Sequence, residues 1–167
     1  ERSFAYGDDV NESRGEQIRT FSPGIRDLAT ESVFEYGSRA GVFRVFRLLD
    51  RYGLKCTAFA AAVALAVNRD AADWLMESGH EVCSHGWRWS EQWTMSREEE
   101  CERIYRAIEL FEKICGTRPM GWYSRWGPSI NTRELLVEAG FLYDSDAYND
   151  DLPYYVEVKG KNHLVIP

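Results

Sequence analysis

A strand-like segment followed by a helix-like segment recurs about every 25 to 30 residues, which is the length of a parallel βα step, and this alternation constrains the fold most. The apolar runs are typical of buried strands and lie at Leu54–Ala60, around Val82, at Met120–Ser124 and at Phe141–Tyr143. Apolar residues at helical spacing fill the segments between them. We therefore predict an α/β fold in which helices cover a parallel sheet or barrel.

Capping signals predict where the helices begin and end. The predicted helices are one around Val42–Leu49 that ends at Gly53, one from a cap at Asn68 to Gly79, one from a capping box at Ser96 and Glu99 to Gly116, and one from a cap at Asn131 to Gly140. After these elements, Tyr154–Val158 and His163–Ile166 flank Lys-Gly-Lys and predict a hairpin.

The chain length predicts one domain over residues 1–167, because 167 residues with 44% hydrophobic content build one well-buried core. Residues 1–30 are polar and aperiodic, which predicts a long loop that folds over a site or an interface, and residues 31–167 hold the βα units. An open sheet would leave unpaired edges, so we expect either further chain at both ends or a partner that covers them. The second alternative predicts a homo-oligomer.

The charge and hydropathy of the chain limit the classes of partner that it can bind. A net charge of -7 without a basic cluster argues against nucleic acid, and no apolar run approaches membrane-spanning length. The chain carries no targeting segment at its start, so we expect a cytoplasmic protein that acts on a neutral or cationic small molecule. Its four cysteines share no CxxC spacing, which favours buried, reduced thiols.

Candidate site residues follow the ends of the predicted strands, where parallel α/β folds build their sites. Four clusters combine titratable groups with aromatic rings, at residues 35–39, 85–89, 122–128 and 144–151. Such a composition suits a water-restricted pocket with a few polar anchors. The chain has six tryptophans and an aromatic content of 14%, so some rings are expected to line this pocket.

The strongest single motif is His85 followed four residues later by Trp89. A second imidazole at that spacing would join His85 on one metal ion, and an indole is no ligand. Hydrolysis here would then depend on carboxylate, imidazole and arginine, with neither metal nor cofactor. His85 is the candidate general base or proton shuttle, although a lone histidine at a strand end is more often a satisfied polar group.

For each of the other candidate residues, a structural role is an alternative to the functional one. Arg39 and Arg125 are predicted to bind a carbonyl or ureido oxygen, although most arginines lie on the surface. Glu35 is either a base or a helix-capping charge. Asp144 and Asp146 are predicted to orient His85 or a water molecule, or else to form an Asx-type turn. The candidate substrate-binding residues are Arg39, Tyr36, Trp89, Trp122, Trp126 and Asp144. Trp122 and Trp126 are as likely to cap the core, whereas Trp89 occupies the position of the second imidazole.

The motifs EYGSRAGV, GHEVCSHGWRW, GWYSRWGPSINTR and FLYDSDAYNDDLP occur here in order. Together they resemble the polysaccharide deacetylase (NodB-homology) superfamily, and most closely its cofactor-independent allantoinase branch. The resemblance implies a distorted (β/α) barrel, incomplete here at both ends. It also implies that the strand with the paired acidic residues of the catalytic base lies upstream, and that a late loop with a further histidine lies downstream.

The resemblance implies a hydrolase of carbon–nitrogen bonds other than peptide bonds. The favoured substrate is a cyclic ureide such as allantoin, which would place the protein in purine catabolism. In that hypothesis an upstream carboxylate or Glu35 activates water with His85, while Arg39 or Arg125 stabilises the oxyanion, and Asp146 assists. The alternatives are a metal-dependent deacetylase of N-acetylated sugar polymers, such as chitin or peptidoglycan, and an inactive barrel that binds carbohydrate or ureide.

Overall fold

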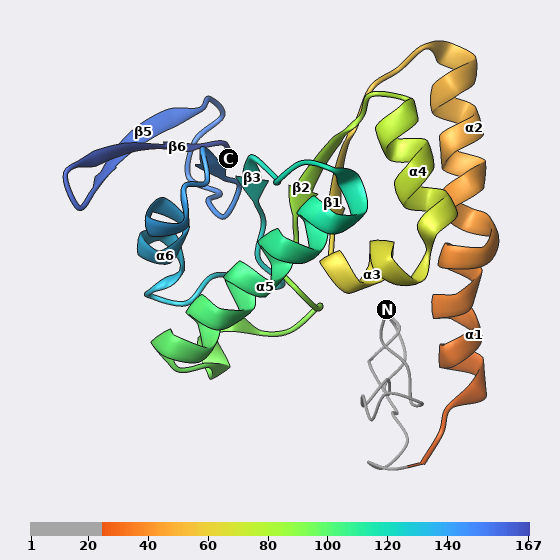
Figure 1. Ribbon diagram of the computed structural model, residues 1–167, viewed down its shortest axis with the longest axis horizontal. Helices are drawn as coiled ribbons and strands as arrows, with labels where there is room; N and C mark the ends of the chain where they lie inside the picture. The colour runs from red at the N-terminus through yellow and green to blue at the C-terminus, as the bar shows by residue number, and fades with distance from the viewer. Residues whose placement is uncertain (1–24) are drawn as a thin grey trace. The chain divides into compact units, whose positions relative to one another are not determined.

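The computed structural model describes residues 25–167, which belong to two compact units divided after Leu54. In the first unit, helix α1 spans Leu28–Tyr36, a π-helical turn η2 spans Gly37–Gly41, and helix α2 spans Val42–Tyr52 (Figure 1). The predicted end of α2 at Gly53 is confirmed, since this glycine has φ 61° and closes the helix in the left-handed conformation.

Residues 35–39 do not form the loop after a strand that the sequence predicted, because α1, η2 and α2 follow one another without a break. Helix α1 is capped by Asp27, whose Oδ1 accepts hydrogen bonds from the backbone N–H groups of Ala29 and Thr30. The predicted loop over residues 1–30 is therefore wrong for residues 28–30. Its residues 1–24 lie outside the described part of the chain.

The second unit alternates strands with helices, as predicted. Its elements are β1 (Thr57–Ala60), α3 (Ala62–Val67), α4 (Arg69–Glu77), β2 (Glu81–Ser84), the 3₁₀ turn η3 (Gln92–Thr94), α5 (Arg97–Cys115), β3 (Gly121–Trp122), α6 (Thr132–Ala139), β4 (Tyr143–Asp144), β5 (Tyr154–Val158) and β6 (Lys161–Val165). The predicted helices that become α4, α5 and α6 are confirmed, and so is the β5–β6 hairpin. Helix α3 was not predicted.

The six strands form one sheet in the order β1-β2-β3-β4-β6-β5. All neighbours are parallel except β5 and β6, so the predicted α/β architecture with a parallel sheet is confirmed. Successive parallel strands lie side by side, and right-handed crossovers therefore place their helices on one face. Helices α3, α4, α5 and α6 contact one another in a single layer, as in a barrel (Figure 1).

The core of this unit lies between that helical layer and the sheet. Ile104 and Ile108 of α5, Leu135 and Leu136 of α6, and Trp122 of β3 form one buried cluster. Adjacent strand residues point to opposite faces, so a neighbour of Trp122 projects away from the helices.

The strand face away from the helices brings Tyr143 over Gly121. A Cβ atom at Gly121 would lie 1.9 Å from Cζ of Tyr143, so glycine is required there. The Tyr143 hydroxyl donates to Glu81 at 2.7 Å, and the other oxygen of Glu81 accepts from Thr57 at 2.7 Å. Burial raises the pKa of the neighbouring Cys83 thiol to about 12, which leaves this cysteine protonated.

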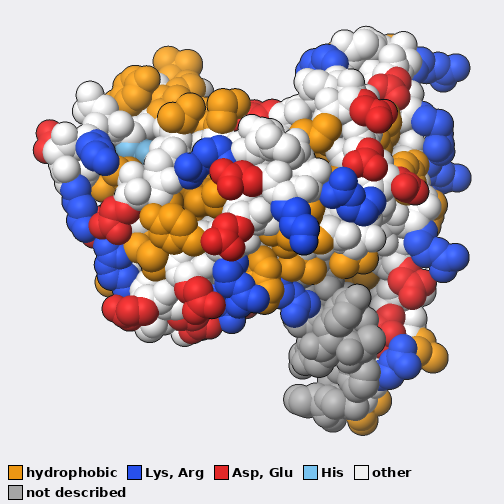
Figure 2. All heavy atoms as spheres, in the orientation of Figure 1, with side chains coloured by type: hydrophobic (Ala, Val, Ile, Leu, Met, Phe, Trp, Pro, Cys, Tyr) orange, Lys and Arg blue, Asp and Glu red, His pale blue; other side chains and the backbone are white. Residues whose placement is uncertain are grey.

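The surface of the described residues is of mixed charge. Lys and Arg side chains alternate with Asp and Glu side chains over the described part of the face shown in Figure 2. Within residues 25–167, none of the helices has both the length and the apolar character needed to span a membrane.

Candidate active site

The carboxyl edge of the parallel sheet brings together three of the four predicted clusters. His85 follows β2, Tyr123 follows β3, and Asp146 lies two residues after β4. The backbone continues the sheet into this edge, because the N–H of His85 donates to Ala60 O at 2.8 Å and the N–H of Tyr123 donates to Ser84 O at 2.9 Å. The site residues are therefore held by rigid strand ends.

The ring of His85 is oriented by a backbone carbonyl. Its Nδ1 lies 2.6 Å from the carbonyl oxygen of Tyr123, which can accept a hydrogen bond but cannot donate one. In the neutral ring Nδ1 therefore carries the hydrogen, and Nε2 is the basic nitrogen. The two rings are stacked, with centroids 5.4 Å apart, and the Tyr123 hydroxyl pairs with that of Tyr148 at 3.1 Å.

Asp146 is held in one orientation by Ser124. The backbone N–H and the hydroxyl of Ser124 each donate to one carboxylate oxygen of Asp146, both at 2.7 Å. Burial raises the pKa of Asp146 to about 6, and this effect outweighs the two hydrogen bonds, which lower it. A carboxyl group with such a pKa exchanges protons near neutral pH, as a general acid or base must.

Asp144 lies behind Asp146 in a buried ionic cluster with Arg133 and His163. Arg133 binds it through two nitrogens at 2.7 and 3.0 Å, and Nε2 of His163 lies 3.0 Å from Oδ2. Burial tends to raise the pKa of Asp144, but the bonds from His163 and Arg133 outweigh it and lower the pKa to about 2. Because Oδ1 of Asp144 also accepts from the N–H of Asp146 at 3.2 Å, this cluster positions the second carboxylate.

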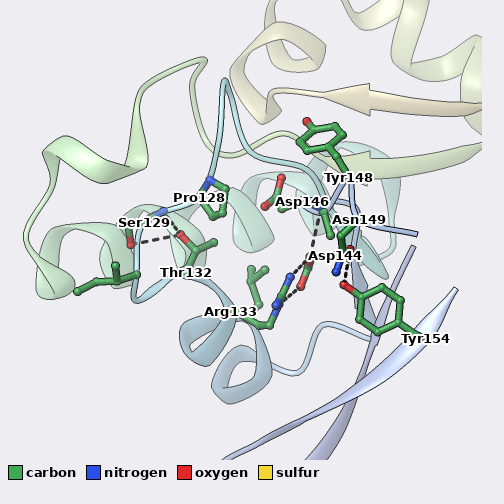
Figure 3. A pocket seen from close by; sticks show the side chains of 12 residues that line it. Pro128, Ser129, Thr132, Arg133, Asp144, Asp146, Tyr148, Asn149 and Tyr154 are labelled. Carbon is green, nitrogen blue, oxygen red and sulfur yellow. Dashed lines mark hydrogen bonds and ion pairs between the residues drawn. The ribbon is translucent and has the colours of Figure 1, made fainter. Parts of the chain in front are cut away.

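An open cavity of about 420 Å³ adjoins these carboxylates, and Figure 3 shows Asp144 and Arg133 joined beneath it with Asp146 at its side. Tyr148, Asn149 and Tyr154 complete one wall. This volume lies in the range of small-molecule sites.

The loops after β2 and β3 stack arginine on tryptophan. The Arg125 guanidinium lies 4.1 Å from the Trp89 ring and donates to Trp89 O at 3.2 Å. Trp126 is 72% exposed and stacks on Trp89 at 6.5 Å. Arg125 itself is buried and carries a permanent positive charge, which the Glu91 carboxylate partly balances from 3.9 Å.

The structure does not bring the remaining predicted site residues to the carboxyl edge of the second unit. Glu35, Tyr36 and Arg39 belong to the first unit, where they are exposed and Arg39 pairs with Glu35 at 3.3 Å. Their role in the site stays a prediction. Trp122 was expected to bind substrate, but it is 1% exposed and packs in the core, and its indole N–H donates to Ser124 at 2.9 Å. It supports the residue that orients Asp146.

The sequence analysis placed Ser124 and Tyr148 in its predicted clusters without giving them a role, and it assigned no role to Arg133 or His163. Arg133 lies in the NTR motif and Ser124 in the GWYS motif, so the motifs contained the signal for both. His163 lies 19 positions after Asp144 on a different strand, and only the pairing of β4 with β6 brings them together.

The donors that residues 25–167 place at this edge do not form a set of metal ligands. Trp89, at the position where a second imidazole would follow His85, packs its ring against Arg125 and Trp126. Within residues 25–167, no three His, Cys, Asp or Glu side chains are grouped as metal ligands.

The pKa of Asp146 predicts a pH dependence of stability. In the unfolded chain its pKa returns to about 3.8, so the protonated carboxyl favours folding below about pH 4, and this contribution is lost as the pH rises through 6. Asp146→Asn has no carboxyl group to ionise, so its free energy of unfolding should not fall over this pH range. Between pH 4 and 7 the variant should therefore gain roughly 2 kcal/mol of stability relative to wild type. Urea unfolding at four pH values measures this, with the exposed Asp150→Asn as control. Parallel curves for Asp146→Asn and wild type would contradict the prediction.

Comparison with known proteins gives the family. The family model "Polysaccharide deacetylase" matches residues 29–141. The peptidoglycan deacetylase of Helicobacter pylori is 30% identical over 125 residues, which cover 74% of this chain and 43% of that protein.

Two solved structures superpose over the whole chain, each with a TM-score of 0.88. One is a probable polysaccharide deacetylase from Pseudomonas aeruginosa PAO1, at 41% identity, and the other is the allantoinase Puue, at 40% identity. This chain covers 57% of each, and less than half of the curated relative. With a match over more than half of its residues, the chain belongs to the polysaccharide deacetylase family.

Proposed function

We propose that the full-length protein hydrolyses an amide C–N bond in a cyclic ureide such as allantoin, and that it does so without a metal ion. The observation that carries this proposal is Trp89, which stands where a second metal-binding histidine would follow His85 and is stacked against Arg125 at 4.1 Å. The likeness to an allantoinase, at 40% identity over the whole chain, supports the choice of substrate.

The proposed reaction begins with proton transfer from water to Nε2 of His85. The hydroxide oxygen bonds to the amide carbon, and the carbonyl oxygen takes the negative charge of the tetrahedral intermediate. Arg125 supplies a permanent positive charge to stabilise that oxygen. The C–N bond then breaks, and His85 returns the proton to the leaving nitrogen, so that protons balance.

Asp146 is the proposed second acid–base group. With a pKa of about 6 it is partly protonated at neutral pH, and Ser124 fixes its direction at the cavity. Either Glu35 or a carboxylate outside the described residues assists water activation, and Arg39 assists substrate binding. Asp146 lines the cavity of about 420 Å³, whose volume suits a small cyclic ureide, whereas His85 and Arg125 lie outside that lining.

The second candidate is a metal-dependent deacetylase of N-acetylated sugar polymers. The relationship to a peptidoglycan deacetylase favours it. It requires ligands from outside residues 25–167, because the described residues offer no set of three. An inactive barrel that binds its ligand without turnover is the third.

Allantoin hydrolysis by the full-length protein, followed as allantoate formed in the presence of a strong chelator, tests the proposal. We expect turnover that is unchanged by the chelator. Activity that the chelator abolishes and zinc restores would overturn the metal-free mechanism. Absence of turnover under both conditions would overturn the substrate assignment, and hydrolysis of N-acetylglucosamine oligomers under zinc would then favour the deacetylase.

A further inference from the structure

The cavity of about 420 Å³ adjoins the proposed reaction centre and does not contain all of it. Asp146 lines the cavity, whereas His85 and Arg125 do not. A substrate whose amide reacts at His85 and Arg125 therefore has a non-reacting part to place in the cavity, on the far side of Asp146. In allantoin that part is the ureido arm, which the hydantoin ring carries as a substituent.

Arg133 presents hydrogen-bond donors to this cavity. Its Nε and Nη2 bind the two oxygens of Asp144 at 2.7 and 3.0 Å, which uses two of the five N–H groups of a guanidinium. The other three, on Nη1 and Nη2, point away from Asp144 because the group is planar. The side chain is 35% exposed and lines the cavity, so a ligand can reach these donors (Figure 3). Asp144 already fixes the guanidinium, and binding does not have to order it.

Tyr154 presents an acceptor to the same cavity. Its hydroxyl donates to Oδ1 of Asn149 at 2.8 Å, in an exposed part of the wall, so its oxygen can only accept from a ligand. Tyr154 lies near Arg133, since the pKa of Arg133 is raised by the hydrogen bond to Asp144 and, to a smaller extent, by the charge of Tyr154. A group with a carbonyl oxygen next to an N–H can therefore bind both residues.

The charges around the cavity favour a neutral occupant. Although burial opposes it, His163 and Arg133 lower the pKa of Asp144 to about 2, so this carboxylate is ionised. Burial raises the pKa of Asp146 to about 6, and Asp146 adds negative charge above that pH. A carboxylate on the ligand would be repelled by both aspartates, and an ammonium group would be repelled by Arg133. A ureido group is neutral and has a carbonyl flanked by N–H groups.

We propose that Arg133 and Tyr154 bind the ureido arm of the substrate and select it against hydantoins that lack the arm. Arg133 donates to the carbonyl oxygen of the arm, and the Tyr154 oxygen accepts from an N–H of the arm. This inference rests on the proposed function and adds to it the residues that determine which cyclic ureide is accepted.

NMR tests binding without turnover, through the ¹H–¹⁵N signal of Arg133 Nε in the full-length protein, which Arg133→Lys assigns. Ethylurea is the probe for the arm, and propionate and propylamine are the charged controls. We expect ethylurea to shift the signal in a saturable manner, and both controls to bind more weakly. Tyr154→Phe should weaken ethylurea by about fivefold, since one hydrogen bond is lost. Tyr155→Phe is the matched control, because Tyr155 is 69% exposed on the same strand and outside the cavity lining.

Turnover gives a second readout, the ratio of kcat/KM for allantoin to kcat/KM for hydantoin. Arg133→Lys keeps a positive charge for Asp144 but has no planar set of donors, and it should lower this ratio by about tenfold. If Arg133 had only a structural role, the substitution would lower kcat/KM for both substrates equally and leave the ratio unchanged.

The inference is overturned if ethylurea leaves the Arg133 signal unchanged, if propionate binds more tightly, or if Tyr154→Phe binds ethylurea as wild type does. Allantoin turnover with an unchanged ratio in Arg133→Lys would remove the arm site and leave the proposed hydrolysis standing. Ethylurea binding at Arg133 in a protein that does not hydrolyse allantoin would instead overturn the proposed substrate and keep the arm site.

Discussion

His85→Gln should lower kcat/KM of the full-length protein by about 10²–10⁴-fold, with little change in KM, because glutamine has no basic nitrogen to accept the proton of water. The geometry supports this, since Nδ1 is held by Tyr123 O at 2.6 Å and the basic nitrogen is therefore Nε2. Steady-state hydrolysis of whichever substrate the full-length protein turns over measures the loss.

His80→Gln is the matched control. His80 and His85 flank the same strand β2, at its two ends, and a glutamine oxygen can still accept from Cys56. This variant should keep kcat/KM near wild type. Should both substitutions reduce activity equally, His85 would have a structural role and no role in proton transfer. A ligand affinity that survives in a protein with no turnover would favour the inactive-barrel alternative.

The sequence predicted the elements whose signals are local. Gly53, Gly116 and Gly140 each end a helix with positive φ, as predicted, because only a residue without Cβ adopts this conformation at low cost. The prediction that residues 35–39 form a loop was wrong. Gly37 and Gly41 are typical of loops, but here the backbone stays helical through a π turn, in which the Val42 N–H donates to Gly37 O.

Asn131 occupies the predicted N-cap position of α6, but its side chain makes no capping bond. The start of α6 is instead held to α5 by the buried carboxylate of Glu100, which accepts hydrogen bonds from the hydroxyls of Ser129, at 2.6 Å, and Thr132. Partners about 30 positions apart leave no periodic signal, so a single sequence cannot reveal them.

For the candidate site, the sequence predicted which residues meet at one edge of the sheet but not how they pair there. The rule that strand ends build the site placed His85 and Asp146 at one edge, because it depends only on strand direction. The division of labour between Asp144 and Asp146 was not predictable, since it depends on which carboxylate meets Arg133 and His163 and which meets Ser124. Two aspartates two positions apart thus acquire pKa values of about 2 and about 6.

Asp144→Ala should lower the free energy of unfolding by about 3–5 kcal/mol at neutral pH. The substitution removes the carboxylate that pairs with both Arg133 and the buried His163. Part of the Arg133 side chain reaches solvent, at 35% exposure, so the lower half of that range is expected. Because the folded pKa of Asp144, about 2, is below its unfolded value of 3.8, the wild type should lose about 2.5 kcal/mol of this stability as the pH falls from about 4 through 2, and the variant should not. Urea unfolding of the full-length protein measures both effects.

Asp150→Ala is the control for this substitution, because the exposed Asp150 accepts bonds from the backbone N–H groups of Asp151 and Leu152 in the next loop. It should cost less than about 1 kcal/mol. An Asp144→Ala variant as stable as this control would show that the ionic cluster contributes little to folding. If stability falls as expected, activity should fall with it even under conditions where the variant is fully folded, because Asp146 loses the acceptor that holds its N–H at 3.2 Å. The cluster then serves the fold and the acid–base group together.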